Sequence, residues 1–406
     1  MHLLDWCADG DIQGGMKSQT GSRSRSSSRD ITGLVDAART VVAAKGLSGM
    51  SLRTVAEEAG TSVGSISYRI GDRTALVSAM LDREIELMAE ARAEWRARLG
   101  SLDPVATGIL PDLICEWLDQ GAGRRRTSAI VTCELTLLAS REPSALPRIG
   151  ALLDEGEALW RDVLARVPQS ERMADLIAGY CLDEQPFSVL LADETDYRLL
   201  RHSTVRGLLR DPAASASPAL TQWHMALVDR LAVPAAAAHD EAAKVPEGTK
   251  AMLADHIADL IADQGVGALS HRTVAQAAGV ATSSVAHHFP TQRDILFAGV
   301  ETLYRRMRSQ IQSSNANIRN REIARLTHEC ALQALGDPAV RPFAIDMRRR
   351  RAENVHAQFA EWVGIPAGSD RARVQALVMA LIGAGLRTMA VDGEWLTARE
   401  AVDKWL

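Results

Sequence analysis

The side chains with useful chemistry gather around two glycines, Gly60 and Gly279. Each glycine is preceded by a Thr-Val-Ala segment and followed by serine, threonine, arginine or histidine, which supply hydrogen-bond donors and positive charge. No residues have the spacing of a nucleophile–base pair, a glycine-rich phosphate loop or a metal site, and the five cysteines never form a CxxC pair. The sequence therefore favours recognition through polar contacts, and we expect no enzyme activity and no cofactor.

Both glycines belong to a pattern that the chain carries twice. Aligning Gly60 with Gly279 pairs residues 34–76 with 253–295, and 12 of the 43 positions are identical. Beyond this segment an acid and two prolines recur in the same order, as Glu134, Pro143 and Pro147 and as Glu329, Pro338 and Pro342. The chain is therefore expected to consist of two similar halves.

Short helices are expected on both sides of each repeated glycine. Apolar residues at spacings of three and four predict a first helix, a serine caps a second, and the glycine supplies the left-handed stop. A third short helix and one long helix follow. This is a helix-turn-helix, whose third helix protrudes far enough to enter a major groove. The expected boundaries are Asp30, Gly46, Ser51, Gly60, Ser62 and Asp72 in the first copy and Gly265, Ser270, Gly279 and Pro290 in the second.

From Gly46 to Leu76 the sequence resembles the TetR family of bacterial transcription regulators. The resemblance implies a DNA-binding transcription regulator that acts as a repressor and has no enzyme activity. It implies that the third helix reads bases, that the start of the second adds a contact, and that the start of the fourth binds phosphate. The corresponding positions are Arg53, Ser62, Val63, Ser65, Tyr68, Arg69 and Arg73 in the first copy, and Arg272, Ala281, Thr282, Ser284, His287, His288 and Gln292 in the second.

The two copies differ in the residues that would face DNA. By the resemblance Arg53 and Arg69 would bond a guanine edge, each contributing roughly 1–3 kcal/mol of discrimination, whereas Arg73 would contact phosphate without reading sequence. Residues 22–76 hold eight basic and five acidic side chains, and residues 247–296 hold three and five. Because phosphate neutralisation supplies most non-specific affinity, we expect the first module to dominate. The second would bind weakly, bind in a pH-dependent manner through its histidines, or no longer bind DNA.

Composition predicts an all-α fold, because 47% of residues are hydrophobic, only 4% are aromatic, and strand-like alternation is missing. The net charge of −5 confines any DNA contact to a local patch. The expected division is a disordered Ser/Arg-rich arm (1–29), a first helix-turn-helix domain (30–77), a helical regulatory domain (78–232), a linker (233–248), a second helix-turn-helix domain (249–296) and a second helical regulatory domain (297–406).

Members of the resembled family act as homodimers on palindromic operators. One chain with two readers is therefore expected to fold as an intramolecular pseudo-dimer, with a further homodimer left open. The resemblance also implies a small apolar effector, bound in a helical domain, that shifts the long fourth helix and releases double-stranded DNA. No apolar run approaches the roughly 20 residues that span a bilayer, so a cytoplasmic protein without a membrane partner is expected. The alternative is a ligand-sensing or protein-interaction protein whose helix-turn-helix modules have degenerated.

Two further groups of residues have open roles. The runs Arg124–Arg126 and Arg348–Arg351 are expected as solvated or interface charges of the regulatory domains in preference to DNA contacts. Six aromatic residues could line an effector cavity, although core packing is the more common role at helical spacing. They are Trp117, Trp160, Tyr180, Phe187, Trp223 and Trp362.

Overall fold

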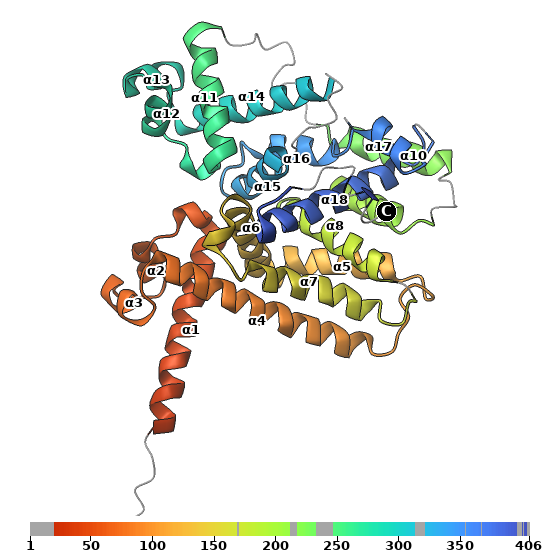
Figure 1. Ribbon diagram of the computed structural model, residues 1–406, viewed down its shortest axis with the longest axis horizontal. Coiled ribbons are helices and arrows are strands. Elements are labelled where there is room, and N and C mark those ends of the chain that lie inside the picture. Colours follow the sequence, from red (N-terminus) through yellow and green to blue (C-terminus); the bar gives the residue numbers. More distant parts are fainter. Residues whose placement is uncertain are drawn as a thin grey trace, which may run out of the picture.

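The computed structural model describes residues 20–168, 170–211, 217–232, 247–312, 321–353, 355–366, 368–395, 400 and 402–403, and every regular element within them is a helix. Figure 1 shows a central bundle with one small helical module on each side of its left-hand end. The first half contains α1 (Thr20–Lys45), η1 (Leu47–Gly49), α2 (Leu52–Glu58), α3 (Val63–Arg69), α4 (Arg73–Leu99), α5 (Leu110–Ala122), α6 (Arg126–Arg141), η2 (Pro143–Ala145), α7 (Ile149–Val163), α8 (Glu171–Leu190), α9 (Thr195–Leu208) and α10 (Pro218–Arg230). The second contains α11 (Gly248–Gln264), η3 (Val266–Ala268), α12 (His271–Ala278), α13 (Thr282–His288), α14 (Gln292–Gln312), α15 (Arg321–Gly336), α16 (Arg341–Arg349), α17 (His356–Trp362) and α18 (Arg371–Asp392). The predicted all-α class is confirmed.

The turns of the first module follow the local sequence. Gly46, with φ of 69°, ends α1, and Gly60, with φ of 61°, separates α2 from α3. Both values lie where only glycine is unstrained. The Ser51 hydroxyl accepts from the Thr54 backbone N–H at 3.1 Å, while the Thr54 hydroxyl accepts from the Ser51 N–H at 2.9 Å. This reciprocal cap satisfies two backbone donors and fixes the start of α2.

The start of α1 differs from the expectation. The helix begins at Thr20, ahead of the predicted cap Asp30, so the prediction of a disordered arm is wrong for residues 20–29. Serine and arginine are acceptable helix residues, and no proline stands between Thr20 and Lys45 to end the helix. Residues 1–19 of the expected arm lie outside the described part of the chain.

The second module repeats these devices. Gly265 and Gly279 have φ of 84° and 65°, and Ser270 and Thr273 exchange the same pair of bonds, at 3.1 and 2.9 Å. One cap is missing, because Ala281 precedes α13 without a side chain that can accept a backbone N–H. The scaffold of the repeat is therefore kept, and its third helix begins less firmly.

The repeated glutamates have the same structural role in both halves. The Glu134 carboxylate on α6 accepts from the Leu47 backbone N–H at 3.3 Å, and the Glu329 carboxylate on α15 accepts from the Val266 N–H at 3.1 Å. Each bond joins the body of one half to the turn after the first helix of its own module. The repeat thus covers the attachment of each module as well as the module itself.

The two halves pack as a pseudo-dimer through α8 and α18. A Cβ on Gly383 would lie 1.9 Å from the Gly179 carbonyl oxygen, so the helices cross at a distance that only glycine permits. Beside the crossing, Arg348 donates to Glu184 at 2.6 Å and the His328 ring contacts Asp183 at 2.9 Å, all fully or nearly fully buried. Arg348 is therefore an interface residue, as the sequence led us to expect.

Helix α18 is the central core helix. The expectation that no apolar run is long enough to span a bilayer is wrong for this helix, which alone among the described residues is long and apolar enough to do so. However, 67% of its apolar window is buried inside the protein. Leu377 of α18 and Phe359 of α17 share one hydrophobic cluster with Trp117 and Trp160 of the first half. A common core makes the two halves one folded body, and α18 is largely buried within it.

Candidate nucleic-acid interface and ligand cavity

Helix α3 presents its polar side chains to solvent and is anchored by one apolar residue. Ile66 is fully buried, whereas Tyr68 on the opposite face is 91% exposed. The Ser62 hydroxyl caps the helix by accepting from the Ser65 N–H at 3.1 Å. In Figure 1, α3 lies at the outer edge of its module, away from the bundle. The residues of this face that the sequence singled out are Ser62, Val63, Ser65, Tyr68 and Arg69.

Arg53 at the start of α2 is exposed, and its guanidinium lies 3.0 Å from the Glu57 carboxylate one turn along. An exposed pair of this kind contributes about 0–1 kcal/mol. Arg53 can therefore leave Glu57 to bind a DNA phosphate or a base edge at little cost in free energy.

Arg73 has a structural role that the sequence did not reveal. Its guanidinium donates to the Leu47 carbonyl at 2.8 Å and to the Met50 carbonyl at 3.1 Å, tying the start of α4 to the turn before α2. These bonds use two of the five guanidinium donors. In the second module the Gln292 amide donates to the Leu269 carbonyl, the equivalent of Met50. Arg73 and Gln292 therefore make equivalent bonds in the two modules, but only Arg73 adds a positive charge.

The equivalent face of α13 carries no arginine. Thr282 and His287 are exposed, while Ser284 and His288 are partly buried and the two imidazole rings lie 5.2 Å apart. Arg272 on α12 is exposed and matches Arg53. The predicted residues of α13 are therefore exposed or partly exposed, and this helix has imidazoles at the positions where α3 has Tyr68 and Arg69.

A buried polar link between the first module and the bundle was missed by the sequence reasoning. Arg39 on α1 donates to Glu84 on α4 at 2.6 Å and to the Ser128 hydroxyl on α6 at 2.9 Å. Arg39 and Glu84 are both buried. Each occupies an apolar stripe, Arg39 between Val35 and Val42 and Glu84 four residues after Met80. A charge within an apolar stripe is the signal that could have found them.

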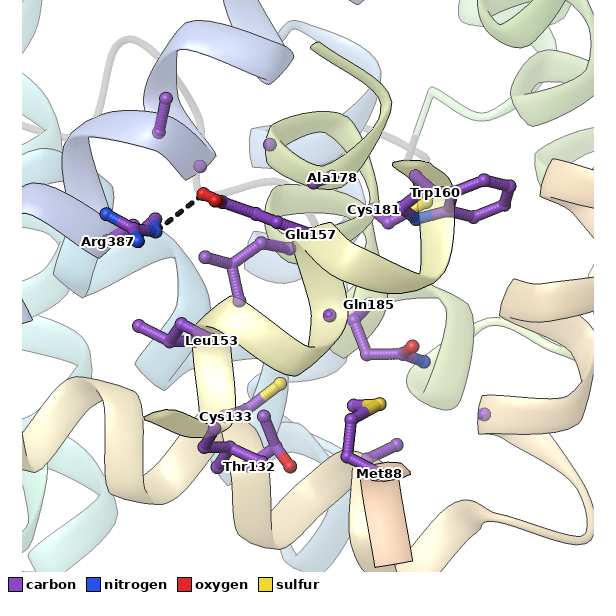
Figure 2. Close-up of a pocket in the computed structure, with 18 of the residues that line it drawn as sticks. Met88, Thr132, Cys133, Leu153, Glu157, Trp160, Ala178, Cys181, Gln185 and Arg387 are labelled. Carbon is purple, nitrogen blue, oxygen red and sulfur yellow. Dashed lines mark ion pairs between the residues drawn. The ribbon is translucent and has the colours of Figure 1, made fainter. Parts of the chain in front are cut away.

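A cavity of about 290 Å³ lies in the first half and is closed on one side by α18 of the second. Its wall combines apolar residues of α4, α5, α6, α7 and α8 with a few polar groups. Figure 2 shows Glu157 pointing to Arg387, away from Gln185 and Met88. Burial raises the pKa of Glu157, an effect that Arg387 opposes. A cavity that combines apolar walls with converging polar groups is typical of a small-molecule site.

The six aromatic candidates divide between wall and core. Trp117 and Trp160 line the cavity and lie 6.3 Å apart in an edge arrangement. Tyr180 and Phe187 are fully buried in the packing between the halves, and Trp223 is exposed. Trp362 packs against the cluster that holds Trp117.

Comparison with known proteins supports the modules directly. The family described as "Bacterial regulatory proteins, tetR family" matches residues 34–80 and again residues 253–298. No curated protein matches the chain. The two matched segments coincide with α1 to α4 and with α11 to α14, which the structure folds alike. The chain therefore carries, in tandem, two modules of the tetR family of bacterial regulatory proteins.

Proposed function

We propose that the chain is a cytoplasmic transcriptional repressor whose first module supplies most of the affinity for DNA and whose first-half cavity binds the releasing effector. The observation that carries this proposal is the contact between the cavity wall and the module. Ser128 lines the cavity and accepts the Arg39 hydrogen bond from α1 at 2.9 Å. A ligand that displaces Ser128 therefore acts on Arg39, which belongs to the first helix-turn-helix module.

A second connection runs along α4. This helix begins at the reader with Arg73 and lines the cavity with Met88, four turns further on. A ligand that pushes Met88 outward tilts α4 and moves the Arg73 tie with it. Because a ligand shifts an equilibrium only by its differential affinity for two states, the effector must fit the cavity better when α4 is displaced.

The asymmetry between the modules supports the dominance of the first. The first segment, residues 22–76, holds eight basic and five acidic residues, whereas the second, residues 247–296, holds three and five. Since DNA affinity depends on phosphate neutralisation, a chain with these readers contacts one half-site strongly and the other weakly. Such a pseudo-dimer is free to recognise an operator that is not palindromic.

The direct test is selection of genomic DNA fragments by the purified full chain, followed by footprinting of the enriched sequence. The proposal expects a footprint in which one half-site is strongly protected and the adjacent one weakly. Light scattering on the complex gives the number of chains bound, expected to be one. Two chains on a symmetric footprint would contradict the pseudo-dimer as the DNA-binding unit.

The weak charge of the second module also favours a second candidate, a ligand-sensing protein that acts by binding another protein. If this second candidate is correct, the wild-type chain binds genomic DNA no better than a variant in which Arg53 and Arg69 are both alanine. The same selection experiment therefore separates the two candidates.

A further inference from the structure

The cavity of the first half contains a cation that the protein itself does not pair. Arg125 lines this cavity and is partly buried, with its guanidinium 3.9 Å from the Trp117 ring centroid. Its one side-chain hydrogen bond reaches the Met88 sulfur at 3.5 Å, a weak acceptor. No carboxylate of the described residues forms an ion pair with it. Stacking on Trp117 accounts for its packing but leaves the guanidinium without a carboxylate in direct contact.

The nearest acids are occupied by other arginines. Glu84 accepts from Arg39 at 2.6 Å, and Glu94 accepts from Arg124 at 3.1 Å. Burial lowers the pKa of Arg125 to about 10, which Glu84 opposes only in part. Retaining a partly buried, unpaired guanidinium is costly unless a partner arrives from outside.

An unsatisfied amide lies on the same side of the cavity. Gln185 on α8 also lines it, and its buried Nε2 has no partner within the protein. A Cβ on Gly121 would lie 2.3 Å from that nitrogen, so the amide rests against the last turn of α5. Trp117, under Arg125, is one turn earlier on the same helix. The Arg125 guanidinium and the Gln185 amide therefore both lie near the C-terminal end of α5.

The other charged groups of the wall are compensated or solvated. Glu157 is paired with Arg387 at 2.5 Å and with Arg161 at 3.0 Å, and Asp175 is paired with Arg161 at 2.9 Å. Asp392 is exposed to solvent. Among the charged groups of the wall, Glu157 is thus balanced by arginines, whereas Arg125 has no carboxylate paired with it, and apolar side chains such as Trp117, Trp160 and Leu153 line the same cavity.

We propose that the ligand of this cavity is a small aromatic or otherwise apolar molecule with a single carboxylate, which Arg125 and Gln185 bind. This inference rests on the proposed function and replaces the wholly apolar effector expected from the sequence. A guanidinium binds a carboxylate through two parallel N–H bonds, and the Gln185 amide supplies a third donor. The volume of about 290 Å³ suits a bicyclic ring system.

The test is calorimetric titration of the full chain with 2-naphthoate and, as the neutral isostere, 2-naphthamide. The carboxylate is expected to bind roughly tenfold to hundredfold more tightly, as for hydrogen bonds to charged groups. Arg125→Met should abolish that preference and Arg125→Lys should keep part of it. Arg148→Met, which removes an exposed arginine that pairs with Asp82 outside the cavity, should leave the preference unchanged, and thermal melts check that each variant folds.

Equal binding of both probes, unaffected by Arg125→Met, would overturn the carboxylate inference and leave an effector cavity in place. Binding of neither probe would overturn it as well. A separate gel shift with 2-naphthoate tests regulation. Carboxylate binding that depends on Arg125 but does not change DNA affinity would contradict the proposed function and leave the ligand class standing.

Discussion

Arg39 and Glu84 form a buried ion pair, 2.6 Å long, between the first helix of the DNA-binding module and the long helix that leads into the bundle. The pair also contacts Ser128 in the cavity wall through Arg39. The pair therefore forms a polar connection between the cavity wall and the first DNA-binding module.

Removing one member of the Arg39–Glu84 pair leaves a buried charge without a partner. We expect Arg39→Met to lower the free energy of unfolding by about 3–5 kcal/mol. The double variant Arg39→Met/Glu84→Leu should recover most of the loss, since a well-packed apolar pair costs little. Urea titrations measure both. A double variant as unstable as the single one would show that the charges matter less than the geometry.

The glycine crossing should be intolerant of a side chain. Gly383→Ala would bring a methyl group to 1.9 Å from the Gly179 carbonyl oxygen, so the two halves must separate locally. We expect a loss of about 1–3 kcal/mol or more in unfolding free energy. Gly33→Ala is the matched control, because no atom lies within 4 Å of its added methyl. It should be neutral or stabilise by about 0.5–1 kcal/mol, and equal effects would argue against a close crossing.

Glu134 makes stability depend on pH. Burial raises its pKa to about 7, assisted by nearby Glu329 and opposed by the Leu47 N–H and Arg141. The folded state therefore binds a proton that the unfolded state releases near 4.5, so stability falls as the pH rises from about 4.5 to about 7.

Glu134→Gln removes this titration and keeps an oxygen for the Leu47 N–H. We expect the variant to gain on the order of 3 kcal/mol over the wild type at pH 8 and little at pH 4.5. Thermal melts across this range test it. An equal difference at both pH values would assign the effect to packing.

The chain itself supplies a substitution that separates the two roles of Arg73. Glutamine occupies the equivalent position in the second module, where it binds the Leu269 carbonyl. Arg73→Gln should therefore preserve the fold and lower the slope of log affinity against log salt by about 1, the effect of one lost phosphate contact. An unchanged slope would mean that Arg73 serves only as a structural tie.

The local fold was predictable where single residues decide it. Ser51, Gly60 and Asp72 determine caps and turns within a few residues of themselves, and the structure has each cap or positive φ where expected. The first helix was predicted to begin at Asp30, whereas in the structure it begins at Thr20. No proline lies between these two positions, so nothing in the sequence prevents the helix from starting ahead of the predicted cap.

The functional interior was less accessible from the sequence. Arg39 acts through Glu84 and Ser128, which are 45 and 89 residues away in the chain, and Arg125 bonds Met88, 37 residues away. Spacing along one helix cannot reveal such contacts. One wall of the cavity is formed by α18 of the second half, whereas its other walls come from the first half, between Met88 and Gln185. The repeat predicted that the halves pack together, and only the folded chain places their residues around one space.

The central claim is that the two modules contribute unequally to DNA recognition. The measurement is a gel-shift titration of a selected operator fragment with two matched double variants, Arg53→Ala/Arg69→Ala in the first module and Arg272→Ala/His288→Ala in the second. With each specific arginine contact contributing about 1–3 kcal/mol, the first variant should weaken binding more than a hundredfold and the second less than tenfold. Equal losses in the two variants would contradict the account.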